Sequence, residues 1–230
     1  GGPPENSLRS MVGGTVFGFT PRGPVEGRRV RESAMIQNVW CVGRNYAEHA
    51  KELGNAVPTE PLFFLKAGST VTTEEILSLP DWIEDLHHEL EIAFRFGEDL
   101  RFSHVGLALD LTERTLQSQL KSKGQPWTLA KSFTGSCPLS EMKPLPASVS
   151  EWGLRLKING ELRQDGKSSQ MLFTPEVLRE FALRHFPVVP GDLLLTGTPP
   201  GVGPLAKGDR LEAELSADGK SFLRVAWERP

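Results

Sequence analysis

Glu89 and Glu91 have the spacing of a paired oxygen site for a metal ion. They are separated by one residue in an alternating segment, so on a strand both carboxylates project from the same face. Two carboxylates this close repel each other and are driven towards protonation unless a cation lies between them. Oxygen-only ligands favour Mg²⁺, Mn²⁺ or Ca²⁺. The alternative interpretation is the solvated polar face of an amphipathic strand.

Asp110 strengthens the metal interpretation because it is an acid within an apolar run, residues 105–111. A lone carboxylate in a buried strand costs several kcal/mol unless it is paired or bound to a metal. We therefore predict Asp110 as a third oxygen ligand of the cation. The alternative is a structural ion pair with Arg114 or Lys131.

A second group of residues could move protons. His49 and Glu52 are three residues apart in a segment of helix-forming composition, residues 46–53, so they share one helix face. A carboxylate that accepts from one imidazole nitrogen raises the basicity of the other, which suits the activation of water. The alternative is an ordinary pair on a solvated helix.

Lys131 and the turn at residues 196–203 could contact a ligand. Lys131 lies in a segment, residues 127–133, that we predict as a strand, where its charge needs a partner. That partner is either an anionic substrate or Asp110. The turn is rich in glycine and proline, so its main-chain N–H groups and the Thr198 hydroxyl can approach a ligand. A plain turn between strands is the alternative.

The elements that must position these residues are mostly strands. Apolar and alternating segments predict strands within residues 38–42, 61–65, 87–96, 104–111, 154–158 and 191–195, and a final pair within 208–228. The dipeptide Asn159-Gly160 predicts a hairpin turn, and residues 174–185 predict one helix with Pro175 in its first turn. Because strands and helices do not alternate regularly, we expect a mainly β, α+β fold rather than a doubly wound parallel sheet.

Composition and charge limit the class of protein. The chain has 230 residues, of which 38% are hydrophobic and 24% charged, with a formal net charge of −3; this predicts a soluble globular protein. The basic cluster at residues 28–31 is flanked by acids, so no nucleic-acid partner is expected. No segment approaches the ~18–20 apolar residues of a membrane span. Cys41 and Cys137 are expected to be buried free thiols, and the expected location is the cytoplasm.

Taken together, these segments resemble the fumarylacetoacetate hydrolase family, and within it the short, acylpyruvase-like branch. The matching segments occur in the family's order, at residues 42–49, 61–66, 87–91, 108–112, 124–133, 159–164 and 196–203. The resemblance implies a fold of rolled, packed mixed β-sheets that forms a homodimer. We expect residues 1–35 to be a turn-rich lead-in with a hairpin at residues 15–19, its first ten residues outside the fold, and residues 36–230 to be a single catalytic domain.

The resemblance also implies roles for individual residues. One Mg²⁺ or Mn²⁺ ion would be held by Glu89, Glu91 and Asp110. The catalytic residues would be His49 and Glu52, on a short lid-like helix, together with Lys131. The implied substrate-binding residues are Arg44, Arg114, Gln117, Lys131 and Thr198. Thr115 stands where the family usually has an acid, which predicts a less firmly anchored Arg114 and an altered substrate preference.

The chemistry predicted first is hydrolysis of acylpyruvates, which are 2,4-dioxo acids, to pyruvate and a carboxylic acid. His49, oriented by Glu52, would take a proton from the water that attacks C4, and the metal and Lys131 would stabilise the departing enolate. Decarboxylation or keto–enol tautomerisation of oxaloacetate are the alternatives, because they use the same enolate. More distant alternatives are a non-catalytic protein that binds a metal or a small acid, and a purely structural β domain.

Overall fold

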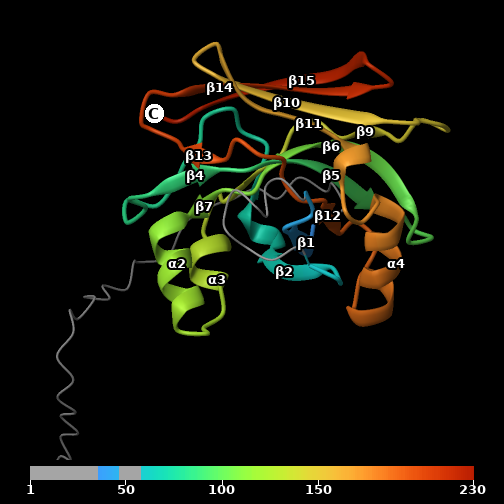
Figure 1. Ribbon diagram of the computed structural model, residues 1–230, viewed down its shortest axis with the longest axis horizontal. Helices are drawn as coiled ribbons and strands as arrows, with labels where there is room; N and C mark the ends of the chain where they lie inside the picture. The colour runs from blue at the N-terminus through green and yellow to red at the C-terminus, as the bar shows by residue number, and fades with distance from the viewer. Residues whose placement is uncertain (1–35, 47–57) are drawn as a thin grey trace, which may run out of the picture. The chain divides into compact units, whose positions relative to one another are not determined.

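A mixed six-stranded sheet forms the centre of the computed structural model, which describes residues 36–46 and 58–230 (Figure 1). Its strand order is β2-β1-β12-β5-β6-β9. The bounds are Leu62–Ala67 for β2, Asn38–Gly43 for β1, Leu193–Leu195 for β12, Leu90–Phe96 for β5, Phe102–Leu109 for β6 and Lys143–Pro144 for β9. Strands β1 and β12 are parallel and the other neighbours are antiparallel, so the sheet is mixed.

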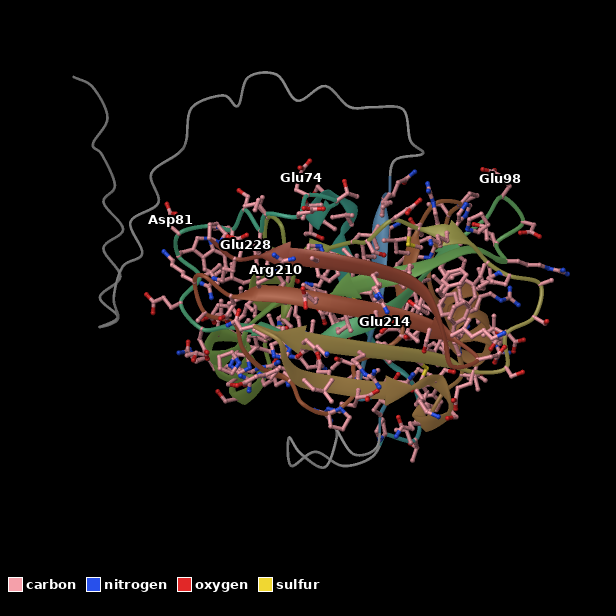
Figure 2. The ribbon with its side chains drawn as sticks, turned by 90° about the horizontal axis from the view of Figure 1, so that it is seen from above. Glu74, Asp81, Glu98, Arg210, Glu214 and Glu228 are labelled. Atoms are coloured by element: carbon pink, nitrogen blue, oxygen red, sulfur yellow. The ribbon has the colours of Figure 1, made fainter. Side chains whose placement is uncertain are left out.

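A four-stranded antiparallel sheet, in the order β11-β10-β14-β15, lies across one face of the first (Figure 1). Its strands are Glu161–Lys167, Trp152–Ile158, Arg210–Ala217 and Lys220–Glu228. Burial alternates along β10, because every second side chain faces the first sheet. Figure 2 looks onto the outer face of this sheet, where Arg210 and Glu214 lie.

The hairpin between β10 and β11 has the turn that the sequence predicts. Ile158 pairs with Glu161, which leaves Asn159 and Gly160 as the two turn residues. Both have positive φ angles, 52° and 82°, as a type I′ turn requires. This conformation explains why an Asn-Gly pair occupies the turn.

Short elements complete the described chain. Two small sheets contain β13 (Gly203–Pro204), β4 (Leu86–His88) and β7 (Thr112–Glu113), and β3 (Val71–Thr72) with β8 (Cys137–Pro138). The helices are η1 (Gly68–Thr70), α2 (Arg114–Ser122), α3 (Thr128–Lys131), η2 (Ser168–Gln170) and α4 (Pro175–His185). Helices α2 and α3 lie side by side (Figure 1). No helix in these ranges is long and apolar enough to span a bilayer.

The largest core cluster lies between the two main sheets. Leu90 and Ile92 of β5 meet Leu154 and Leu156 of β10 there, and all four are fully buried. A second cluster on the opposite face of the six-stranded sheet includes Ala93. Burial on both faces explains the nearly continuous apolar runs of the central strands.

The mainly β, α+β fold is confirmed, as are the predicted strands outside residues 127–133 and the helix at 174–185. The prediction of a strand at residues 127–133 was wrong, because this segment contains α3. A run of seven mixed residues is too short for its periodicity to separate a strand from a helical turn. Helix α2 was not predicted. The predicted helix at residues 46–53, apart from Tyr46, and the predicted lead-in at residues 1–35 lie outside the described residues.

Candidate functional site

The three acids predicted as metal ligands are brought together where β5 and β6 meet. Glu89 directly precedes β5, Glu91 lies on β5, and Asp110 directly follows β6. The antiparallel register pairs Leu90 with Leu109, and the main-chain N–H of Asp110 donates to the carbonyl of Glu89 at 2.8 Å. One carboxylate oxygen from each acid lies within 4.8 Å of the other two, and all three side chains are buried. The interpretation of a solvated polar face is therefore wrong.

Lys131 reaches this group from the last turn of α3. Its Nζ donates to Glu89 Oε2 at 2.9 Å, to Asp110 Oδ2 at 2.6 Å and to Thr112 Oγ1 at 2.6 Å. The ammonium is buried, and these two carboxylates hold its pKa above the ordinary value against the effect of burial. Lys131 thus pairs with Asp110, from a helix instead of the predicted strand.

Lys66 is a second buried lysine at the site, and no sequence pattern assigned it a role. It lies on β2, and its Nζ is 2.8 Å from Asp110 Oδ1. Its ammonium donates its three hydrogens to the carbonyls of Leu111, Lys131 and Ser136. Asp110 Oδ1 is therefore buried without a hydrogen bond from the described residues.

The electrostatics of the triad fit a hard divalent cation. Burial and the negative charges of Asp110 and Glu89 raise the pKa of Glu91 well above its usual range. Burial also opposes ionisation of Glu89, but Lys131 and Arg114 hold its pKa well below the usual range. Asp110 Oδ1, which accepts no hydrogen bond from the described residues, and the Glu91 carboxylate, whose ionisation is disfavoured, would both gain from a cation ligated by oxygens. The residues present therefore fit the predicted Mg²⁺ or Mn²⁺.

A recess lies over the triad and collects the predicted substrate-binding residues. Its lining consists of Val42, Gly43, Arg44, Leu62, Phe64, Glu89, Glu91, Asp110, Arg114, Gln117, Lys121, Trp127, Lys131 and Thr198. All five residues predicted to bind substrate are among them. The structure thus brings together side chains from β1, β2, β5, α2 and α3 at one opening.

Arg114 is firmly anchored, contrary to the expectation from Thr115. Its guanidinium donates to Glu89 Oε1, and to Gln117 Oε1 at 2.8 Å. Thr115 instead donates its hydroxyl hydrogen to Asp85 Oδ2 at 2.8 Å. The predicted weakening at Arg114 was wrong because the anchoring partners come from β5 and α2 and do not require an acid at position 115.

Thr198 is held in place by the main chain and by Gln164. Its hydroxyl donates to the carbonyl of Leu90 at 2.8 Å and accepts from Gln164 Nε2 at 2.7 Å. Gln164 is a buried residue of β11 that the sequence analysis matched within residues 159–164 without giving it a role. Because the Thr198 hydroxyl donates its hydrogen to the Leu90 carbonyl, it could donate to a substrate only if that hydrogen bond were broken.

The turn that carries Thr198 depends on a close main-chain approach at Gly197. The N–H of Gly197 donates to Glu91 Oε2 at 2.7 Å, which fixes the Glu91 carboxylate. Gly197 has a φ of 94°, and a Cβ atom at this position would lie 2.8 Å from Asn45 Cβ. Glycine is required here for both reasons.

The predicted dyad of His49 and Glu52 lies outside the described residues. The residues that precede the dyad are described: Arg44 lines the recess and has a φ of 60°, and Tyr46 is buried. The Tyr46 hydroxyl has no hydrogen-bond partner among the described residues. Burial and the nearby Glu91 charge raise its pKa, so the phenol is protonated at neutral pH.

Comparison with known proteins agrees with this geometry. The family described as "Fumarylacetoacetate (FAA) hydrolase C-terminal" matches residues 38–225. A bovine relative, "Oxaloacetate tautomerase FAHD1, mitochondrial", is 40% identical over 210 residues, which cover 84% of this chain and 93% of the relative.

Two solved structures extend the comparison. A putative fumarylacetoacetate isomerase/hydrolase from Oleispira antarctica is 41% identical, with a TM-score of 0.80, over 85% of this chain and 94% of that one. Fumarylpyruvate hydrolase from Pseudomonas aeruginosa, in complex with Mn²⁺ and pyruvate, is 27% identical, with a TM-score of 0.76, over 92% of this chain and 97% of that one. The chain described here belongs to the fumarylacetoacetate hydrolase family.

Proposed function

We propose that this chain is a divalent-metal-dependent enzyme that interconverts the keto and enol forms of oxaloacetate. The buried triad of Glu89, Glu91 and Asp110 beneath a cationic recess carries the proposal, because it suits a metal and an anionic substrate together. The 40% identity to a relative named as an oxaloacetate tautomerase favours this reaction over acylpyruvate hydrolysis, which the sequence analysis ranked first.

The reaction requires that a proton leave C3 of oxaloacetate and that a proton reach the C2 oxygen. The three acids would hold Mg²⁺ or Mn²⁺, which supplies Lewis-acid polarisation of the 2-oxo group when it is bound. Lys131 lies between Glu89 and Asp110, where its positive charge would offset the negative charge that develops on the C2 oxygen. The low polarity around these buried groups would strengthen that attraction.

His49 would transfer the proton that leaves C3. We propose that Glu52 accepts a hydrogen bond from one imidazole nitrogen and that the other takes the C3 proton. The same proton, or one from solvent, would then reach the oxygen, so the reaction consumes no water. These two roles rest on the family resemblance, which matches His49 and Glu52 to the family's catalytic His–Glu dyad.

Acylpyruvate hydrolysis is the second candidate, favoured by the similarity to a structure named as fumarylpyruvate hydrolase. It would require His49 to activate a water molecule that attacks C4, with cleavage of the C3–C4 bond. Decarboxylation of oxaloacetate would use the metal without an attacking water. A homodimer and a cytoplasmic location stay predictions, and the bovine relative is named as mitochondrial.

The test is an assay of the purified chain with Mg²⁺ or Mn²⁺ on oxaloacetate, which follows loss of the enol absorbance, and on acetylpyruvate, which follows product formation. We expect acceleration of ketonisation, a loss of at least about 100-fold in Asp110→Asn and in His49→Ala, and no change in Glu212→Gln, an exposed acid of β14. A chain that hydrolyses acetylpyruvate but does not accelerate ketonisation would contradict the proposal and support the second candidate.

A further inference from the structure

Lys121 belongs to the recess, yet the sequence analysis gave it no role. Arg114, Gln117 and Lys121 stand at positions i, i+3 and i+7 of α2, so they share one helix face. All three line the recess over the triad. The Lys121 Nζ lies 4.9 Å from the centroid of the Trp127 ring, a cation–π contact that holds the lysine stem against the wall.

Three other cations at the site are already paired with protein groups. Lys66 and Lys131 contact Asp110, and Arg114 donates to Glu89 and Gln117. These three cations balance the formal charge of the three acids. A bound divalent cation would therefore leave the site positive and ready for an anion.

Lys121 adds to this positive charge instead of neutralising it. Within residues 36–46 and 58–230, no carboxylate lies within ion-pair distance of its Nζ. Burial lowers the pKa of Lys121 to about 8, and the positive charges of Arg114, Arg44 and Lys131 act in the same direction. Like charges gathered at a half-buried site repel, and a bound anion relieves that repulsion.

We propose that Lys121, together with Arg44, binds the second carboxylate of a 2-oxo dicarboxylate, so that the site selects dicarboxylates over 2-oxo monocarboxylates. The inference rests on the proposed function and deepens it, because it names the residues that would bind the end of the substrate away from the metal. Lys131 cannot serve this end in the arrangement described, because its three hydrogens go to Glu89, Asp110 and Thr112. The Lys121 ammonium has three donors, and among the described residues it contacts the Trp127 ring.

The experiment measures dissociation constants by titration calorimetry on the Mg²⁺-loaded protein. The two ligands are oxaloacetate and 2-oxobutanoate, in which a methyl group replaces the second carboxylate. The variants are Lys121→Met, Lys121→Arg and, as a matched control, Lys123→Met, which removes an exposed charge two residues away. Because oxaloacetate is the proposed substrate, the parent and every variant carry His49→Ala, so that the titration measures binding without turnover.

We expect Lys121→Met to weaken oxaloacetate binding by about tenfold or more, since a hydrogen bond to a charged group is lost. Binding of 2-oxobutanoate should change less than about twofold, Lys121→Arg should retain most of the affinity, and Lys123→Met should match the parent. Equal weakening of both ligands, or no weakening of either, would overturn the inference. A protein that shows this selectivity but no tautomerase activity would contradict the proposed function and retain the role of Lys121.

Discussion

Gln164 of the outer sheet accepts a hydrogen bond of 3.0 Å from the main-chain N–H of Leu90, the residue between Glu89 and Glu91. Its Nε2 donates to Thr198 Oγ1 at 2.7 Å and to the carbonyl of Pro199 at 2.9 Å. One carboxamide therefore links the segment that carries Glu89 and Glu91 to the turn that carries Thr198. We infer that Gln164 positions the metal site without touching the metal.

Replacing Gln164 with methionine should damage both stability and metal binding. The N–H of Leu90 would stay buried without an acceptor, which costs about 1–3 kcal/mol in the free energy of unfolding. Mn²⁺ affinity should fall by about 10-fold, because supporting residues orient metal ligands. Urea unfolding and Mn²⁺ titration check the two effects, with Gln119→Met at an exposed position of α2 as control. Unchanged Mn²⁺ affinity in Gln164→Met would contradict the positioning role.

Lys66→Met should destabilise the fold more than the loss of any exposed lysine. The change removes the partner of Asp110 and one donor to each of three buried carbonyls, those of Leu111, Lys131 and Ser136. The Lys131 and Ser136 carbonyls keep the hydrogen bonds that they accept from the Ser136 hydroxyl and from the N–H of Leu111. Breaking a buried pair from one side costs about 3–5 kcal/mol, which urea unfolding of the metal-free protein would measure. Lys207→Met, at an exposed lysine, should cost almost nothing. A similar loss in both variants would show that Lys66 has no special structural role.

Binding of oxaloacetate should weaken as the pH rises through the pKa of Lys121, which is about 8. Lysine carries its charge below its pKa, so the ammonium that meets the second carboxylate is lost above it. Burial and the positive groups Arg114, Arg44 and Lys131 lower this pKa, and Glu89 opposes them. Dissociation constants measured between about pH 7 and about pH 9 should rise for oxaloacetate and stay flat for 2-oxobutanoate. In Lys121→Arg the dissociation constant of oxaloacetate should not change over this pH range, because arginine stays charged. A dissociation constant that does not change with pH for either ligand in the parent chain would contradict the assignment.

Local patterns were sufficient to predict much of the acid triad. The spacing of Glu89 and Glu91 on a strand places both on one face, and the apolar run around Asp110 makes that acid conspicuous. The pattern could not predict that β5 and β6 pair in the register that brings the three acids together, because strand pairing is a long-range property.

The supporting residues were harder to find because their partners are distant in sequence. Lys66 contacts Asp110, which lies 44 positions further along the chain, and Gln164 contacts Leu90 from another sheet. Lys121 lies in a polar segment whose helix was missed, although its spacing from Arg114 would have placed both on one face. Each of these is a charged or amide residue whose burial is decided by the tertiary fold, so the local sequence could not predict it.

The most direct test of the account is a Mn²⁺ titration of the purified chain, followed by electron paramagnetic resonance of the free ion. The account predicts one bound Mn²⁺ per chain. It predicts a loss of affinity of at least about 100-fold in Glu91→Gln and in Asp110→Asn, with the exposed control Glu212→Gln unchanged. Failure of the parent chain to bind Mn²⁺, or equal binding by all three variants, would contradict the claim that these acids form a metal site.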